Sequence, residues 1–191
     1  MKKKQSGLIF YEKKNRVSSE LISEMLSLLF YTAIAVAIAW LLVMGFGFRV
    51  RMIGASMLPE IKSGQFVFID RVLYRLKSPK RGDIVAFYPN GNENAHVMIR
   101  RVIAMPGETV RIEEGTVYID DQPETDTGSG YDRVADPGIA SGGLTLGERE
   151  YFVLGDLRSI GEDSRSPGIG AVNKDFIIGK AWMWTGEGGE Q

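Results

Sequence analysis

Few residue types in this chain can carry covalent or metal chemistry. The sequence contains no cysteine and a single histidine, His96. The absence of cysteine excludes a disulfide scaffold, cysteine-based zinc sites and a cysteine nucleophile. One histidine leaves no multi-histidine metal site, and a Ser-His-Asp triad would depend entirely on His96. The sequence therefore indicates no metal and no cofactor, and a serine hydroxyl remains among the candidate nucleophiles.

Four short segments hold the residues that could form such a hydroxyl-based site. They are GASMLP at residues 54–59, GDIV at 82–85, RRVIAMPGE at 100–108 and GDLRSIGEDSR at 155–165. In order and spacing they resemble the G-x-S-M-x-P, G-D-[IV]-V, K-R-V-I-G-x-P-G-[DE] and G-D-N-R-x-x-S-x-D-S-R motifs of type I signal peptidases. The resemblance extends from about residue 25 to residue 184.

The resemblance implies a membrane-anchored serine endopeptidase that removes signal peptides from exported preproteins. Ser56 takes the place of the nucleophile, and its own backbone N–H is the expected oxyanion donor. Such enzymes use a Ser-Lys dyad, because burial can lower the pKa of a lysine until it acts as a base. Apart from the resemblance, a serine in this context is more often an ordinary turn or strand-edge hydroxyl.

The chain departs from the motifs where the base should lie. Arg100 occupies the lysine position, and Gly161 replaces the serine whose hydroxyl contacts and orients that lysine. An arginine pKa starts at about 12.5–13.8, so reaching 7 costs at least about 7.5 kcal/mol. Arg100 could stabilise a negative charge at Ser56 but should not remove its proton. Three further positions also differ: Glu60 stands for Thr, Ala104 for Gly and Leu157 for Asn.

Other bases are poorly placed. His96 lies four strand residues before Arg100, or about 13 Å, and is expected to be a strand-end or surface histidine. The remaining lysines of the outer region match no dyad position and are expected to be solvated charges: Lys62, Lys77, Lys80, Lys174 and Lys180.

Supporting roles are implied for several charged residues of the motifs. The resemblance implies a structural salt bridge between Asp163 and Arg165, although from the residues alone two exposed loop charges are nearly as good an interpretation. Arg101 matches the second basic residue of the third motif and is expected to support packing. Asp156 and Arg158 are expected to support their loop.

A long apolar segment precedes the motifs. Residues 25–48 contain no charged side chain, and this length suits a transmembrane helix. Residues 1–24 carry six basic side chains, whereas only Arg49 and Arg51 follow the span closely. The positive-inside rule therefore predicts a cytoplasmic N-terminus in the bacterial cell membrane, crossed once, with residues 49–191 outside.

The outer region is predicted to be mostly β. Strands are expected at residues 65–70, 83–88, 96–105, 109–113, 116–120, 150–154 and 176–184, with a hairpin at Glu114-Gly115. This pattern favours an antiparallel β-barrel or sandwich of the signal peptidase type after one transmembrane helix. Residues 71–81 could hold a helical turn and residues 128–143 a loop. Five apolar residues around Ser56 could be core or touch the bilayer: Met52, Ile53, Met57, Leu58 and Ile61.

Four regions follow: a cytoplasmic basic segment at 1–24, the span at 25–48, a peptidase-like domain at 49–184 and a flexible tail at 185–191. The expected partners are the lipid bilayer and exported preproteins, or extended peptides with small residues near the cleavage site. A net charge of −1 gives no reason to expect nucleic acid. The alternative function is that of a catalytically impaired family member, an accessory peptide-binding or surface-protein and pilus assembly factor.

Overall fold

The computed structural model describes residues 19–46, 48–72, 74, 77–124, 133–159 and 162–185. It divides into two compact units, with the boundary between Leu41 and Leu42. The first unit holds most of helix α1 and the second holds the β domain. Gly161 and the predicted tail beyond Thr185 lie outside the described residues.

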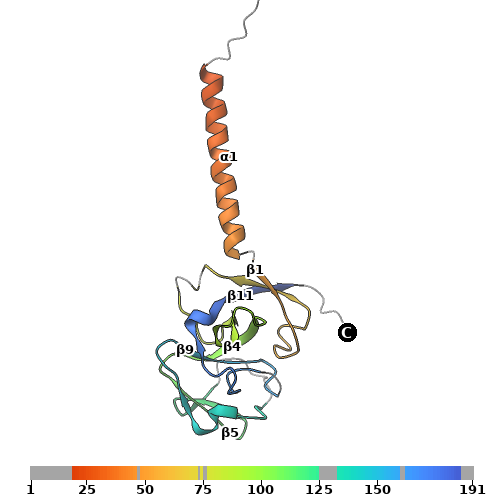
Figure 1. The fold of residues 1–191 in the computed structure, drawn as a ribbon, viewed down its shortest axis with the longest axis vertical. Coiled ribbons are helices and arrows are strands. Elements are labelled where there is room, and N and C mark those ends of the chain that lie inside the picture. The colour runs from red at the N-terminus through yellow and green to blue at the C-terminus, as the bar shows by residue number, and fades with distance from the viewer. Residues whose placement is uncertain are drawn as a thin grey trace, which may run out of the picture. The chain divides into compact units, whose positions relative to one another are not determined.

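Helix α1 runs from Ser19 to Phe46 (Figure 1). Its apolar window Ser19–Val43 has a mean hydropathy of 2.4, and none of the window is buried within the structure. At 1.5 Å per residue, 28 residues extend roughly 42 Å, so length and composition suffice to cross a membrane. The helix begins before the predicted Met25 and ends before Phe48, which lies in a strand.

The domain contains two sheets among the described residues, and every strand pair is antiparallel. The larger sheet has the order β1-β2-β11-β3-β4-β9-β10 and the smaller β7-β6-β5-β8. In Figure 1, β5 lies at the opposite end of the domain from β1 and β11. The strands are β1 Phe48–Arg51, β2 Phe66–Asp70, β3 Ile84–Phe87, β4 Met98–Ala104, β5 Thr109–Glu113, β6 Thr116–Ile119, β7 Gln122–Pro123, β8 Leu144–Thr145, β9 Glu150–Leu154, β10 Val172–Asn173 and β11 Ile177–Thr185.

The seven predicted strands are all present, with ends that differ by no more than two residues. The predicted hairpin is confirmed: Glu114 and Gly115 both have positive φ, at 48° and 77°, and Glu113 faces Thr116 across the ladder. The mostly β, antiparallel prediction is therefore correct. Four short strands were missed: β1, β7, β8 and β10. A strand of two residues has no alternation to detect, and β1 follows directly on the apolar run.

The segment after β1 is anchored by its apolar side chains. Met52, Met57 and Ile61 belong to a core cluster that also contains Val67 of β2 and Ile99 of β4. Core burial is therefore the correct interpretation for these three residues, whereas Ile53 is 66% exposed. Because Met57 and Ile61 are fully buried, the backbone between them and β1 has little freedom.

Candidate active site

Ser56 lies in the turn that follows β1, in the wall of a groove of about 510 Å³. The residue is only 6% exposed. One side of the groove is formed by residues 51–56 and the other by residues 95–100, with Pro89 and Glu162 completing the lining. The first and third motif segments therefore meet across this groove.

The fourth segment packs directly against the Ser56 backbone. The Leu157 N–H donates to the Ser56 carbonyl at 3.0 Å. A side chain at Gly155 would place its Cβ 2.6 Å from that carbonyl oxygen, so glycine is required here by the close approach of two backbones.

Two donors of Ser56 are left unused by the described residues. Neither its hydroxyl nor its backbone N–H has a hydrogen-bond partner within the part of the chain that the structure describes. Leu58 N–H, two positions on, closes the turn by donating to the Ala55 carbonyl. Ser56 therefore lines the groove with an N–H and a hydroxyl that no described residue uses, which an oxyanion donor and a nucleophile would require.

Arg100 projects from β4 and is also only 6% exposed. Its Nε and Nη2 donate to the Glu162 carbonyl at 2.9 and 2.5 Å, and its Nη1 donates to the Ile99 carbonyl at 2.7 Å. Burial lowers the pKa of Arg100, and the nearby positive charge of Arg165 lowers it further. The Asp163 and Glu162 carboxylates raise it, but the net pKa remains below its usual value. The acceptors that a buried arginine needs are thus main-chain carbonyls, and neither Ile99 nor Glu162 was identified from the sequence.

The strand register explains why the Ile99 carbonyl is accessible. Both backbone groups of Val102 point toward the chain that leads into β3. Its N–H donates to the Asp83 carbonyl, and its carbonyl accepts from the Gly82 N–H. In an antiparallel ladder alternate residues point their backbone groups to opposite sides, so Ile99 points away from β3. Strand β9 begins its pairing with β4 only at Arg101. The β4 edge at Ile99 therefore faces the groove without a strand partner among the described residues.

His96 is exposed and precedes β4, which begins at Met98. The expectation of a surface position is confirmed, but His96 also lines the same groove as Ser56 and Arg100. It has no hydrogen-bond partner within the described residues.

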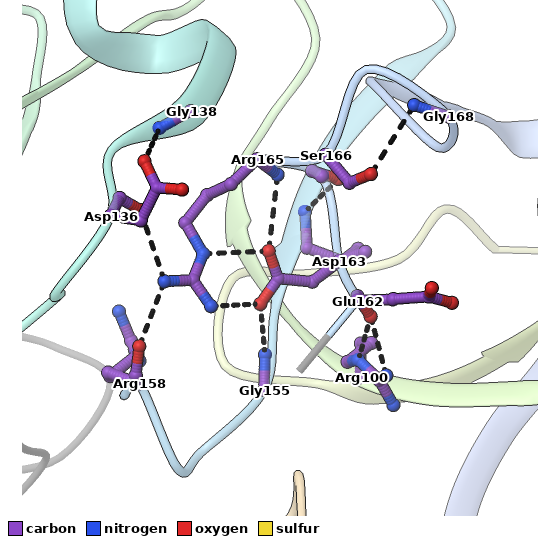
Figure 2. Close-up of polar contacts among 12 residues, drawn as sticks. Arg100, Asp136, Gly138, Gly155, Arg158, Glu162, Asp163, Arg165, Ser166 and Gly168 are labelled. Carbon is purple, nitrogen blue, oxygen red and sulfur yellow. Dashed lines mark hydrogen bonds and ion pairs between the residues drawn. The ribbon is translucent and has the colours of Figure 1, made fainter. Parts of the chain in front are cut away.

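Asp163 and Arg165 form a buried ion pair (Figure 2). Arg165 Nε and Nη2 donate to the two carboxylate oxygens of Asp163, each at 2.8 Å. Asp163 also accepts the Gly155 N–H at 3.2 Å, and Arg165 Nη1 reaches the Arg158 carbonyl at 2.8 Å. The interpretation as two exposed loop charges is therefore wrong. The pair fixes the loop that covers Ser56.

Arg101 and Asp156 form a second fork-shaped pair. Arg101 Nε and Nη2 donate to the Asp156 carboxylate at 2.8 and 2.7 Å, and Nη1 donates to the Gly82 carbonyl at 2.9 Å. The Asp156 side chain is fully buried. This pair links β4 to the start of the fourth segment, in agreement with the packing role expected for Arg101.

The second motif segment serves the framework through Asp83. Its carboxylate accepts bonds from the Tyr74 hydroxyl, the Lys180 ammonium and the Lys80 N–H. Burial raises the pKa of Asp83, but the bonds from Lys180 and Tyr74 outweigh it and hold that pKa below its usual value. The expectation that Lys180 is a solvated surface charge is wrong, because this lysine is half-buried and ion-paired. Its partner lies 97 positions away in the chain, beyond any local pattern.

Comparison with known proteins gives consistent matches. The family model described as "Signal peptidase, peptidase S26" matches residues 24–185. The probable signal peptidase I-2 of Synechocystis sp. is 32% identical over 136 residues, 68% of this chain and 58% of that protein. Signal peptidase I T of Bacillus subtilis is 32% identical over 142 residues, 66% of this chain and 67% of that protein.

A solved structure of signal peptidase I from Enterococcus faecalis is 31% identical. The match covers 56% of this chain and 98% of the solved one, with a TM-score of 0.44. This chain spans less than two thirds of the length of the Synechocystis relative.

Proposed function

This chain belongs to the signal peptidase family S26, and we propose that it is a membrane-anchored signal peptidase I whose Ser56 attacks the cleavage site of exported preproteins. The observation that carries this proposal is the state of Ser56. It lies in the wall of a groove, almost buried, and its hydroxyl and N–H have no partner within the described residues. These are the two donors that an acyl-transfer site needs at one point.

The proposed substrate lies extended in the groove. The Ile99 edge of β4 has no strand partner among the described residues, so a peptide can add there as a further strand through backbone hydrogen bonds. The bound segment should carry small side chains near the scissile bond, as signal-peptide cleavage sites of the A-x-A type do. Arg100 already uses the Ile99 carbonyl, so the peptide must pair with the remaining groups of this edge.

The proposed location is the bacterial cell membrane, with the domain on the outer side. The six basic residues before α1, against two soon after it, support a cytoplasmic N-terminus. In this arrangement the apolar helix keeps the groove attached to the membrane from which preproteins emerge.

A second candidate function, peptide binding with impaired cleavage, is favoured by the contacts of Arg100. Its guanidinium donates three hydrogen bonds to carbonyls, and a cationic guanidinium is the stronger donor for such bonds. Burial lowers the pKa of Arg100, but a guanidinium starts more than 5 units above neutrality. Arg100 therefore remains a cation that can stabilise negative charge at Ser56 without acting as its base. An accessory factor for surface-protein or pilus assembly would need only the groove.

The experiment that tests the proposal is cleavage of a preprotein by the purified, detergent-solubilised chain. Signal-peptide release by the wild type that is abolished by Ser56→Ala supports the peptidase function. The same preprotein with bulky residues in place of the two small ones should resist cleavage. No release, together with crosslinking of the preprotein to the groove, favours the accessory function. Neither release nor crosslinking would contradict both.

A further inference from the structure

Arg100 is a buried cation without a carboxylate partner among the described residues. Its three hydrogen bonds all go to neutral carbonyls. The nearby Asp163 carboxylate is already bound to Arg165. Glu162 offers its carbonyl, while its carboxylate points away from the guanidinium (Figure 2). Buried charges in proteins are ordinarily paired, whereas no carboxylate among the described residues bonds directly to the Arg100 guanidinium.

Two other arginines of the motif segments, Arg101 and Arg165, differ in this respect. Arg101 and Arg165 each hold a carboxylate with two N–H groups of their fork. A guanidinium has five N–H donors, and Arg100 uses three of them. Two N–H donors of Arg100 thus have no acceptor among the described residues, and Arg100 shares its groove with the hydroxyl and N–H of Ser56, which also lack one there.

We propose that this groove binds the free α-carboxylate at the end of a peptide chain, with Arg100 as the cationic contact and Ser56 as a second donor. A carboxylate offers two planar oxygens, which match the guanidinium fork and gain charge-assisted hydrogen bonds. It would occupy the position that the scissile carbonyl occupies in a continuous substrate. The inference rests on the proposed function, because it is the Ser56 groove that places the peptide.

Two sources could supply such a chain end. One is the signal peptide left after cleavage, which ends in the small residues of an A-x-A site; the other is the C-terminus of an exported protein, which has no such restriction. Arg100 places a fixed positive charge where the motif has a lysine that acts as a neutral base. This charge makes the site favour a terminal carboxylate over an uncharged internal peptide bond. The ligand class is therefore a peptide acid, and its preference for small final residues distinguishes the two sources.

The test compares peptide pairs that differ only at the C-terminus. Fluorescence anisotropy with the full, detergent-solubilised chain would measure the affinity of a labelled peptide ending in Ala-x-Ala as the acid and as the amide. We expect the acid to bind at least about tenfold more tightly, since a hydrogen bond to a charged group contributes about 1.5–3 kcal/mol. An acid ending in Leu-x-Phe should bind more weakly than the Ala-x-Ala acid if released signal peptides are the source.

Variants assign the effect to Arg100. In Arg100→Gln the acid and the amide should bind alike, whereas Arg100→Lys should keep part of the preference because it keeps a charge. Arg111→Gln is the matched control: Arg111 lies in β5 of the other sheet, paired with Glu113, and its loss should leave the preference unchanged. Circular dichroism would show that each variant is folded.

The outcomes separate this inference from the proposed function. Equal binding of acid and amide by the wild type would overturn the carboxylate site while leaving a peptide groove intact. A preference that persists in folded Arg100→Gln would overturn the assignment to Arg100. If the chain binds neither the acid nor the amide, and also fails to bind a longer peptide with Ala-x-Ala in its interior, the result would instead count against the proposed function itself.

Discussion

Replacement of Asp163 by asparagine should destabilise the β domain strongly. The Asp163 side chain is fully buried and accepts four hydrogen bonds, from Arg165 Nε, Nη2 and N and from Gly155 N. Asparagine removes the negative charge and turns an amide NH₂ toward donors, so Arg165 is left buried and uncompensated. Breaking a buried pair in this way costs about 3–5 kcal/mol, which corresponds to a fall in Tm of roughly 10 °C or more for a domain of this size.

The assay is thermal unfolding of the detergent-solubilised chain, followed by circular dichroism in the β region. Asp175→Asn is the matched control, because the Arg149–Asp175 pair is exposed on both sides and contributes at most about 1 kcal/mol. Since Asp163 also holds the Gly155 N–H beside Ser56, peptide binding should weaken even below the unfolding transition. Equal, small shifts in Tm for the two variants would refute the assignment of Asp163 as the residue that fixes this loop.

Three further outcomes are expected. Arg100→Lys with Gly161→Ser should raise preprotein cleavage about 10²–10⁴-fold, and adding Ser56→Ala should abolish the gain. Normal cleavage by the wild type would refute this reasoning. His96→Ala would then test whether His96 is the base. Gly155→Ala should destabilise the domain by about 1–3 kcal/mol in thermal unfolding, because its Cβ would lie 2.6 Å from the Ser56 carbonyl oxygen, whereas Gly142→Ala, with nothing within 4 Å, should not. Protease added to intact spheroplasts should degrade residues 49–191; full protection of the domain would contradict the topology.

The elements of this fold were predictable where local pattern carries the information. Alternation and Gly or Pro breaks identified strands such as β5 and β9 with the bounds that the structure has. The Glu114-Gly115 hairpin was predictable because a two-residue hairpin turn needs positive φ, which glycine adopts readily. The apolar run before the domain forms one helix, as predicted. The helix begins at Ser19, before the apolar run, because polar residues at a helix start do not interrupt its backbone hydrogen bonds.

The candidate site was predictable in part. The motif resemblance placed Ser56 and Arg100, and the structure brings both into one groove. The contacts of Arg100 were not predictable, because its acceptors are a neighbouring carbonyl and the carbonyl of Glu162, which lies 62 positions away. Main-chain carbonyls are present at every residue, so no residue type marks them in a sequence.

The sequence by itself predicted seven of the described strands, the presence of the apolar helix, and the serine and arginine that take the motif positions. Only the tertiary structure decided that Asp163 and Arg165 are buried against each other, that Lys180 pairs with Asp83, and that Gly155 presses on the Ser56 backbone. The physical reason is the range of the interactions. Backbone propensity and side-chain periodicity act between near neighbours, whereas burial and hydrogen-bond partners arise when strand register and loop packing bring distant residues together.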